Sequence, residues 1–590
     1  MWLNLDELPE QEYDVVVVGA GGAGMSSALC AAIGGARVLL VERTEYVGGT
    51  TALSGGTTWI PGTRHSAQVN DVDTLQTAEA YLTRAVGDRT PASMRHALLA
   101  AGPEAVDYVE SNSEVKFAPY PIHPDYITEL EGSTMRGRAL EPVPFDGRRL
   151  GKLMNLVRPP IPEFTVLGGM AVDRNDIFHL LRATQTAKSF LYCARIIARH
   201  WRDRLVHGAG TRMVMGRALV GRLLLSLEQK GVTILTQTSV VKIDGGADGV
   251  TAVTLAAGGT RRSVRVRGGL VLASGGFTRH PELRKTMLPG VDIAWCPGAP
   301  GHTGQAHDLA RSLGARYGDK ALSPSFWAPV SIRKRPDGST AVWPHFVMDR
   351  AKPGMITVNK AGRRFLNEST SYHLFGIGMQ EANRQVPSVP AYLVCDAEAL
   401  RKYGIGMVRP RERRLAPYLA DGYLTCGDTL EQLAQTLGID AAGLKDSVAR
   451  INAYSETGVD PDFQRGGTAY QRYNGDATWT GKNPNIGPLA KPPYYAVRLY
   501  PGDIGAATGF VTDEHSRVLD GTGQAIAGLY AVGADAHSVM GGVYTAPGIT
   551  IGPGLVFGYL AARDATKRAQ GVAPNATRST AAETPQRVTA

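Results

Sequence analysis

The chain has 590 residues, of which 43% are hydrophobic and 20% charged, so it has the composition of a folded globular protein and not of a disordered one. The formal net charge of +9 is small for this length and the basic residues are dispersed, so we expect no nucleic-acid partner. Glycine is in excess, at 70 residues, without the Gly-X-Y period of collagen. Because glycine is favoured where backbone turns with positive φ or closely approaches a ligand, this excess indicates a large enzyme around an extended cofactor.

Cysteine usage and the N-terminal segment bear on the compartment. The five cysteines are odd in number and scattered, with no CxxC spacing, which predicts reduced thiols in a cytoplasmic protein. Residues 1–14 are acidic and lack the apolar region of a signal peptide. No run of about 18 apolar residues exists, so no membrane span is expected, and no metal site is indicated either.

The first elements form a βαβ unit of about 30 residues. Residues 14–18 are a continuous β-branched run, typical of a strand buried on both faces of a parallel sheet. We expect a helix over 25–34 and a second strand over 37–42. The later expected elements are a βα pattern over 217–243, short strands at 251–256 and 263–267, a buried strand over 528–535 and a helix over 549–565.

Residues 19–24 form a GxGxxG motif that follows a strand and opens a helix, the context that marks a dinucleotide-binding turn. Gly19 allows the tight turn, and Gly24 lets helix and strand pack closely. Gly21 lets backbone N–H groups meet a pyrophosphate at the helix N-terminus. Glu42 closes the next strand and is expected to accept hydrogen bonds from a ribose.

A second loop, over residues 48–56, is rich in glycine and hydroxyl residues. This loop extends the phosphate cradle and places hydroxyl groups beside a flavin. An enzyme that binds only a nicotinamide cofactor does not need it, so the loop favours FAD. The residues of the two loops that we expect to bind the cofactor are Gly19, Gly21, Gly22, Ala23, Gly24, Glu42, Gly49, Thr50, Thr51, Ser54, Gly55 and Gly56.

With the segments 273–277 (ASGGF) and 528–535 (GLYAVGAD), these motifs resemble the flavoprotein family of succinate dehydrogenase, fumarate reductase and 3-ketosteroid dehydrogenase. The resemblance covers most of the chain outside about 150–210 and the tail. It implies FAD, bound non-covalently, because members with covalent flavin carry a His near position 50 and this loop has none. The further contacts that it implies are Arg43, the backbone near Val240 and Val241 at the adenine edge, Ser274, Gly275, Asp535 at the ribityl chain and Ile549 at the start of the final helix.

The two ends of the chain are expected to build one domain and the middle another. We predict an α/β protein with a discontinuous Rossmann-like FAD-binding domain over 1–295 and 485–568, and an inserted α+β substrate and catalytic domain over 296–484. The tail over 569–590 is rich in Ala, Thr and Pro and has little to bury, which predicts disorder.

The segment 541–553 distinguishes a dicarboxylate from a ketone substrate. A fumarate reductase grips two carboxylates with Arg, and the dicarboxylate branch of the family carries that Arg here, whereas this segment contains no Arg, Lys or His. The segment resembles the ketosteroid dehydrogenase version, in which Tyr544 O–H and Gly548 N–H point at one carbonyl oxygen. Thr545-Ala546 stands where the family usually has Pro-Gly, which bears on pocket shape. Alternatively, Tyr544 packs against the flavin.

A base must remove the proton α to the ketone. Tyr372 follows the segment 362–368 (GRRFLNE), after which the family has its tyrosine base. A free tyrosine has a pKa of about 10, so it needs hydrogen bonds or positive potential that favour the phenolate. The resemblance gives that part to Tyr126, in a Pro-Asp-Tyr context, with Tyr120 as the alternative.

Two further features bear on the substrate. Phe326 and Trp327 resemble the aromatic wall of the same family and are expected either to face a flat apolar substrate or to belong to the core. The insertion 150–210 exceeds compact family members, and within it 179–205 is predicted to be one helix with basic and apolar residues interleaved. Such a helix fits an anionic membrane surface, although it fits a helix that covers the flavin domain or an oligomer contact as well. Whether Tyr192 reaches the substrate mouth stays open.

The sequence therefore predicts FAD-dependent dehydrogenation of a 3-ketosteroid to the Δ1 enone. Tyr372, Tyr126, Tyr544 and Gly548 are the expected catalytic residues, and hydride passes to flavin N5. The alternatives are a desaturase of a small cyclic ketone, a fumarate- or urocanate-type reductase, which the missing Arg disfavours, and a flavin electron carrier. The expected partners are an apolar cyclic ketone, in the first instance a steroid, an electron acceptor such as a quinone, and a membrane surface that the protein contacts peripherally.

Overall fold

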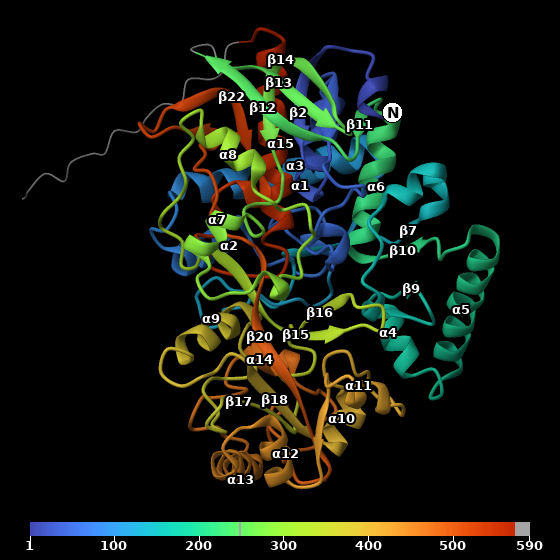
Figure 1. Cartoon of the computed structure of the whole chain (residues 1–590), viewed down its shortest axis with the longest axis vertical. Helices are drawn as coiled ribbons and strands as arrows, with labels where there is room; N and C mark the ends of the chain where they lie inside the picture. The colour runs from blue at the N-terminus through green and yellow to red at the C-terminus, as the bar shows by residue number, and fades with distance from the viewer. Residues whose placement is uncertain (247–248, 573–590) are drawn as a thin grey trace, which may run out of the picture.

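The computed structural model describes residues 1–246 and 249–572. Figure 1 shows two bodies stacked along the long axis: the upper contains the first and the last described segments and the lower contains the yellow and orange middle of the chain. The final helix continues to Ala569, the first residue of the predicted disordered tail. The rest of that tail lies outside the described residues from position 573 on.

A nine-stranded sheet organises the upper body. Its order is β1, β11, β3, β2, β14, β13 and β12, with β22 paired to β14 and β21 to β22. The strands are β1 (Trp2–Leu3), β2 (Glu12–Val18), β3 (Val38–Val41), β11 (Thr233–Leu235), β12 (Ser239–Gly246), β13 (Gly249–Ala257), β14 (Thr260–Leu272), β21 (Arg517–Leu519) and β22 (Ala525–Ala531). The parallel pairing of β2 with β3 and β14 is that of a Rossmann-like sheet, which confirms the predicted α/β class.

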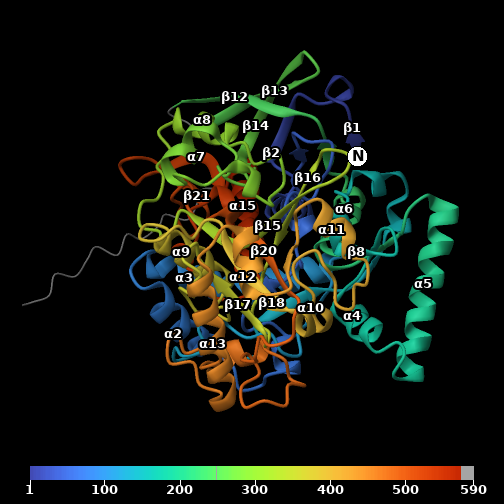
Figure 2. The same cartoon turned by 60° about the horizontal axis from the view of Figure 1, so that its bottom comes forward.

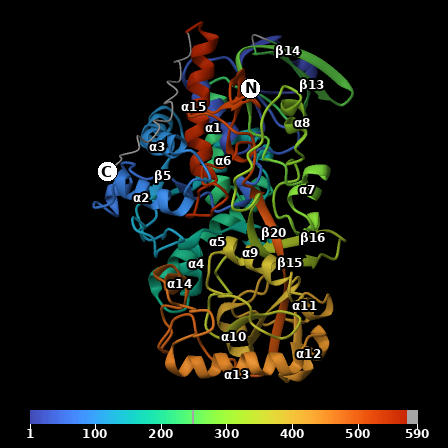
Figure 3. The same ribbon diagram turned by 90° about the vertical axis from the view of Figure 1, so that its left-hand side faces the viewer.

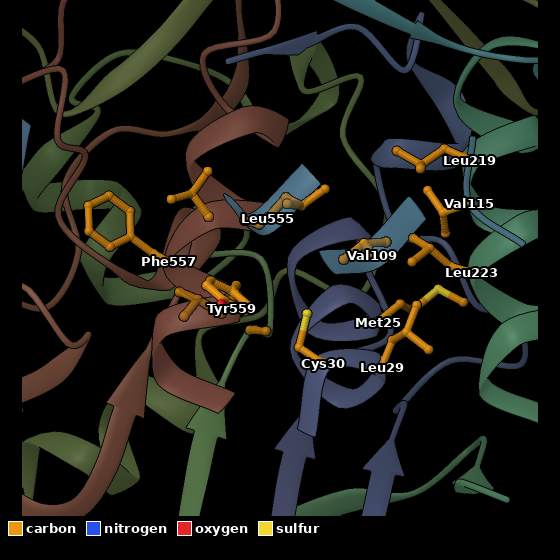
Figure 4. Close-up of a cluster of buried hydrophobic side chains, with 14 of the residues drawn as sticks. Met25, Leu29, Cys30, Val109, Val115, Leu219, Leu223, Leu555, Phe557 and Tyr559 are labelled. Carbon is orange, nitrogen blue, oxygen red and sulfur yellow. The ribbon is translucent and has the colours of Figure 1, made fainter. Parts of the chain in front are cut away.

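The sheet is buried on both faces. Val15 and Val17 of β2 contact a layer of four helices, whereas Val16 and Val18 contact a second apolar cluster with the β12–β14 hairpins. The four helices are α1 (Gly22–Ile33), α3 (Ala92–Asn112), α6 (Met215–Gln229) and α15 (Ile551–Ala569). Figure 4 shows side chains from all four interdigitating, with α1 between α15 and α6. This double burial explains the continuous apolar run that the sequence shows at β2.

A second sheet organises the lower body, in the order β16, β15, β20, β18 and β17, with β19 also paired to β20. Its strands are β15 (Ser325–Lys334), β16 (Thr340–Pro344), β17 (Met355–Val358), β18 (Ala391–Asp396), β19 (Thr425–Gly427) and β20 (Tyr494–Ala506). Its helices are α9 (Tyr372–Ala382), α10 (Ala397–Tyr403), α11 (Ala416–Ala420), α12 (Leu430–Leu437), α13 (Ala441–Thr457) and α14 (Ala469–Asn474). Figure 3 shows α13 beneath this sheet, at the end of the molecule opposite α15. The pairing places β20 in this sheet, although the predicted boundary at 484 assigned it to the first domain.

The described chain also contains smaller elements. They are the sheet of β4 (Thr58–Trp59), β5 (Phe117–Pro119) and β6 (Ala139–Pro142), the pairs β7 (Phe145–Asp146) with β10 (Arg212–Met213) and β8 (Thr165–Val166) with β9 (Met170–Ala171), and the helices α2 (Leu75–Val86), α7 (Pro281–Met287) and α8 (Gln305–Arg311).

The insertion contains two helices, so the prediction of one continuous helix over 179–205 is wrong. They are α4 (Arg174–Leu181) and α5 (Ala187–His207). The chain breaks between them because Thr186 takes an extended conformation and its side chain accepts a hydrogen bond from Ser189 N–H, which starts a new helix. Figures 1 and 2 show α5 standing apart from both bodies. No helix in the described ranges combines the length and apolar character needed to cross a membrane.

The glycine turn after β2 is packed tightly against its surroundings. A Cβ at Gly24 would lie 1.9 Å from the carbonyl oxygen of Gly19, and a Cβ at Gly19, where φ is +103°, would lie 2.2 Å from that of Ala273. By contrast, a Cβ at Gly21 would meet nothing within 4 Å. The turn therefore requires glycine at two positions for packing and leaves the third facing open space.

We predict that Gly24→Ala lowers the free energy of unfolding of the upper body by about 1–3 kcal/mol, because the added methyl group must displace backbone. Gly21→Ala is the matched control and should change it by less than about 0.5 kcal/mol. Urea denaturation of the two cofactor-free variants measures the difference. Equal unfolding midpoints would contradict the packing argument.

Candidate active site

A cavity opens where β2 and β3 end. Its empty volume, measured out to its open mouth, is about 1650 Å³. The predicted cofactor residues that line it are Gly19, Gly21, Gly22, Ala23, Glu42, Arg43, Gly49, Thr50, Thr51, Ser54, Ser274, Gly275 and Ile549. The predicted residues outside its lining are Gly24, Gly55, Gly56, Val241 and Asp535, whereas Val240 lines it. The two glycine loops thus meet around one space.

The two acidic residues predicted to hold sugar hydroxyls are engaged by the protein itself. Glu42 accepts hydrogen bonds from Ala20 N–H at 3.0 Å and Thr44 N–H at 2.8 Å, while it still lines the cavity. The carboxylate of Asp535 is fully buried, where it accepts from Gly276 N–H at 2.6 Å and pairs with His307 at 2.8 Å. Burial opposes ionisation, but His307 and the backbone donors hold the pKa of Asp535 below its usual range. Asp535 therefore supports the 274–276 loop, and its side chain does not line the cavity.

Several buried polar atoms along the cavity have no partner within the described chain. They are Ser274 Oγ, His302 Nδ1 and both ring nitrogens of His537. Burial lowers the pKa of His302 to about 4, so its ring is neutral and can donate or accept. Such atoms destabilise a protein unless a ligand satisfies them. Together with the open space at Gly21, at the N-terminus of α1, they fit a polar, anionic cofactor such as FAD.

Three tyrosines from distant segments meet beside this cavity. The hydroxyl of Tyr126 donates a hydrogen bond to that of Tyr372 at 3.0 Å. The ring of Tyr544 stacks on Tyr126 with centroids 5.6 Å apart and lies edge-on to Tyr372 at 5.0 Å. Tyr372 is the first residue of α9, which Ser371 caps through Leu374 N–H. The structure therefore brings together the three tyrosines that the sequence singled out.

Burial raises the pKa of all three tyrosines, and for Tyr372 and Tyr126 it does so well above the usual value. All three hydroxyls are thus protonated at neutral pH. Tyr126 donates to Tyr372, so the Tyr372 oxygen is the hydrogen-bond acceptor of the pair.

Tyr126 is held by its neighbours on both sides. Its N–H donates to the carbonyl oxygen of Thr545 at 2.8 Å, which ties it to the segment that carries Tyr544. The preceding Asp125 accepts from Trp59 Nε1 at 3.0 Å and from Arg138 at 2.8 Å. Burial raises the pKa of Asp125 to about 6, although Arg138 opposes the shift. Thr545 therefore positions Tyr126 through its backbone, while its own side chain is buried.

Gly548 has a conformation that only glycine readily takes. Its φ is +87°, and a Cβ would lie 2.5 Å from the carbonyl oxygen of Thr57. Within the described part of the chain, the Gly548 N–H donates to no protein acceptor. This N–H is therefore available to a bound ligand, and its predicted role toward a substrate oxygen stays a prediction.

The structure separates the two residues of the predicted aromatic wall. Phe326 lines the cavity and lies edge-on to Tyr544 at 5.1 Å. Trp327 lies on the opposite side of β15, in the cluster around Phe277, and its Nε1 donates to Ser323 Oγ at 2.6 Å. Because successive side chains of a strand point to opposite faces, only one of the two can face the site.

Tyr120, the alternative partner of Tyr372, and Tyr192, the residue considered for the substrate mouth, both form hydrogen bonds outside the tyrosine cluster. The hydroxyl of Tyr120 lies 3.3 Å from Thr57 Oγ1, so Tyr126 and not Tyr120 bonds to Tyr372. Tyr192 donates to Asp176 at 2.7 Å within the insertion, which joins α5 to α4.

Sequence reasoning missed two residues of the site. The ring of Tyr470 lies 4.9 Å from that of Tyr126, and no motif marked it. His373 accepts from Trp327 N–H at 3.2 Å and donates to the carbonyl oxygen of Gly542 at 3.0 Å, so it joins β15 to the 541–548 segment. Burial lowers the pKa of His373 to about 4, which keeps the ring neutral in this role. Its place next to Tyr372 was the one available signal. Among the described residues, no group of three or more His, Cys, Asp or Glu could hold a metal ion.

Comparison with known proteins places these features in a family. The model of the FAD binding domain family matches residues 14–551. The 4-oxocyclohex-2-ene-1-carboxylate 5-dehydrogenase of Sinomonas cyclohexanicum is 38% identical over 561 residues, which cover 94% of each chain. The 3-oxosteroid 1-dehydrogenase of Mycolicibacterium smegmatis is 35% identical over 94% of this chain and 97% of its own.

A solved structure agrees with these relatives. The 3-ketosteroid Δ1-dehydrogenase of Sterolibacterium denitrificans, in complex with 1,4-androstadiene-3,17-dione, superposes with a TM-score of 0.88 at 33% identity, over 94% of this chain and 99% of its own. An open-form flavocytochrome c3 fumarate reductase, with a TM-score of 0.63 at 20% identity, shares the fold alone. The resemblance to the 3-ketosteroid dehydrogenase group is thereby confirmed. The chain belongs to the FAD-binding domain family, and it is an FAD-dependent oxidoreductase of the dehydrogenase type.

Proposed function

We propose that this protein dehydrogenates a 3-ketosteroid to its Δ1 enone. The observation that carries the proposal is the hydroxyl pair of Tyr126 and Tyr372, 3.0 Å apart, packed against Tyr544 beside the cofactor cavity. Fumarate-type reduction needs a cation for each carboxylate, and the 541–553 segment has none. A neutral carbonyl is the group that the tyrosine cluster suits.

Each residue of the cluster has a separate part. Tyr544 O–H and Gly548 N–H donate to the ketone oxygen and stabilise the charge that develops there. Tyr372, as a phenolate supported by the hydrogen bond from Tyr126, accepts the proton from the α-carbon. Bound FAD supplies the hydride acceptor for the neighbouring carbon. Phe326, edge-on to Tyr544, closes the apolar side of the site and excludes water.

A small cyclic ketone is the second candidate substrate, because the relative at 38% identity is named as a dehydrogenase of a cyclohexenone carboxylate. Both substrates need the same enolising tyrosines, so the tyrosine cluster does not distinguish them. A difference in binding must come from the room beyond the first ring.

Anaerobic reduction of the bound flavin by a panel of ketones tests the proposal. We expect bleaching of the flavin absorbance by a 3-ketosteroid at rates that simple cyclohexanones and 4-oxocyclohexane carboxylates do not reach. Faster bleaching by the small rings would assign the second substrate class. Absence of bleaching with every ketone would overturn both assignments.

We predict that Tyr372→Phe reduces the rate of flavin reduction at least about 100-fold, since general bases contribute roughly 10²–10⁴-fold. FAD content should stay unchanged, because Tyr372 does not line the FAD cavity. Acid precipitation should release the FAD of both proteins into the supernatant, as non-covalent binding requires. Tyr120→Phe is the matched control, since its hydroxyl bonds to Thr57 and not to Tyr372. A Tyr372→Phe protein with full activity would exclude Tyr372 as the base.

The insertion gives the proposal a second part, contact with a membrane that holds the steroid and a quinone acceptor. α5 packs on α4 and neighbouring parts of the insertion through its buried residues Ser189, Cys193, His200 and Asp203. Its opposite side carries the exposed apolar residues Phe190, Leu191, Trp201 and Leu205. Lys188, Arg195 and Arg202 flank this apolar stripe along the helix. An apolar stripe edged by basic residues is typical of a helix that lies in an anionic interface.

Flotation with vesicles that contain anionic lipid should recover the protein in the lipid fraction. Phe190→Ser, Trp201→Ser and Leu205→Ser together should abolish flotation, since all three side chains are exposed. Val72→Ser, at an equally exposed apolar site of the upper body, is the control and should float as the parent does. Equal flotation of the triple variant and the parent would exclude α5 as the contact.

A further inference from the structure

A buried arginine behind the tyrosine cluster lacks an ion-pair partner. Arg350 is fully buried, and its guanidinium donates to two backbone carbonyl oxygens, those of His345 at 3.2 Å and of Glu368. Its Nη2 has no hydrogen-bond partner in the described ranges. Across the residues that the structure describes, no carboxylate lies within ion-pair distance of Arg350. Asp349 and Glu368 attract its charge, but neither forms an ion pair with it.

The neighbouring arginines differ from Arg350 in this respect. Arg364 pairs with Glu368 and Asp460 at 2.8 and 2.7 Å, and Arg465 lies 3.3 Å from Glu368. Paired charges produce little potential at a distance, whereas an isolated buried cation acts through a medium of low polarity. Arg350 is thus the member of this group whose field reaches its surroundings.

The position of Arg350 is fixed by a buried network. His345 bonds to Ser331 at 2.7 Å and to Asp349 at 2.6 Å, and Asp349 also accepts from Arg350 N–H. The guanidinium carbon lies 4.7 Å from the ring centroid of Phe375. Ser331, His345 and Asp349 are hydrogen-bonded in the sequence Ser–His–Asp, as in a hydrolytic triad. All three are buried, so we assign them the role of holding Arg350 in place. Arg350 can therefore not swing toward a distant carboxylate.

Two contacts relate Arg350 and Tyr470 to the cluster. The guanidinium lies over the ring of Phe375 in α9, the helix that begins at Tyr372. Tyr470 is 3% exposed, its hydroxyl has no partner among the described residues, and its ring lies 4.9 Å from that of Tyr126. Burial raises the pKa of Tyr470, and the charge of Arg350 opposes that shift. Burial also lowers the pKa of Arg350 to about 10, so the guanidinium stays charged at neutral pH.

We propose that Arg350 is a positioning residue for proton abstraction, whose unpaired charge stabilises the anionic form of the Tyr372–Tyr126–Tyr470 cluster. The inference rests on the proposed role of Tyr372 as the base. The cluster first releases one proton to solvent, and the resulting anion is held on Tyr372 by the hydrogen bond from Tyr126. Tyr372 then takes the α-proton, and the cluster is neutral again until it releases that proton to solvent. FAD, when bound, would accept the hydride from the neighbouring carbon.

The other groups around the cluster do not supply this charge. Tyr120, Tyr470 and Tyr544 raise the pKa of Tyr126 as potential anions, and His373 is neutral. The titratable and charged groups that face the cluster and Arg350 are Tyr120, Tyr544, His373, His345, Asp349, Glu368 and Arg465. Glu368 is engaged by Arg364 and Arg465, and Asp349 by His345. We therefore assign the stabilisation of the phenolate to Arg350, the buried cation of this group without an ion-pair partner among the described residues.

The test is the pH profile of flavin reduction by substrate in the holoenzyme. Only the deprotonated cluster can accept the α-proton. The rate of flavin reduction therefore rises tenfold per pH unit below the apparent pKa of the cluster and levels off above it. Arg350→Met removes the positive charge and should raise that pKa by about one unit, which moves the profile to higher pH. At neutral pH the deprotonated fraction, and with it the rate, should fall roughly tenfold. The rate at the alkaline plateau should stay within about threefold of the parent, and Arg350→Lys should restore the parent profile.

Arg222→Met is the matched control. Arg222 is also buried, donates to three backbone carbonyl oxygens and lies over an aromatic ring, but no tyrosine of the cluster contacts it. Its removal should leave the pH profile in place. A uniform loss of rate at all pH values in Arg350→Met, without recovery in Arg350→Lys, would overturn the proposal and leave Arg350 a structural role. A rate loss confined to substrates with a carboxylate would instead make Arg350 a substrate contact, which also overturns it.

A second measurement separates this inference from the proposed function. In holoenzyme labelled at tyrosine Cζ, the carbon resonance reports ionisation without turnover, and Tyr372→Phe and Tyr126→Phe assign the signals. Arg350→Met should raise the pH at which these signals titrate, and Tyr470→Phe should weaken the effect. If the titration moves although no ketone reduces the flavin, the proposed function fails and the electrostatic role of Arg350 stands. An unmoved titration overturns that role even in an active enzyme.

Discussion

The parallel pairing of β22 with β14 is the contact on which the arrangement of the site depends. Leu270, Val271 and Leu272 align with Leu529, Tyr530 and Ala531, more than 250 residues later in the chain. This register delivers the segment 533–553 to the carboxyl end of the sheet, where the glycine turn also lies. Without it, Tyr544 and Gly548 would have no relation to the cofactor cavity. A buried sheet enforces the register, because a slip of one residue would turn Tyr530 and its neighbours to the wrong face.

Hydrogen bonds between distant segments then join the tyrosines into one unit. Tyr126 is tied to the 541–548 segment by Thr545, and α9 is tied to it by His373 through Gly542. Each tie is a single neutral hydrogen bond in a buried place, where loss of either partner leaves an unsatisfied group. The relative positions of Tyr126, Tyr372 and Tyr544 are therefore set by backbone contacts as much as by the tyrosines themselves.

Burial creates a conflict within the cluster. The same exclusion of water that protects a reactive anion raises the pKa of Tyr372 and Tyr126 well above the usual value. A base in such a place needs a compensating positive potential that does not itself touch the substrate. Arg350 meets this requirement in our proposal, since it is buried, charged and without an ion-pair partner among the described residues. Paired arginines such as Arg364 cannot do so, because their fields are cancelled nearby.

The sequence by itself determined what depends on short segments of chain. The GxGxxG turn, the strand and helix around it, the FAD cofactor and the motif contexts of Tyr126, Tyr372 and Tyr544 are encoded within a few neighbouring residues, so they could be read directly. Only the tertiary structure decided which residues meet. Phe326 and Trp327 are adjacent but lie on opposite faces of β15, Asp535 is taken up by His307, and the helix predicted over 179–205 is divided by the cap at Thr186. Tyr470 and Arg350 carried no motif, because their place behind the cluster arises from packing between segments more than a hundred residues apart.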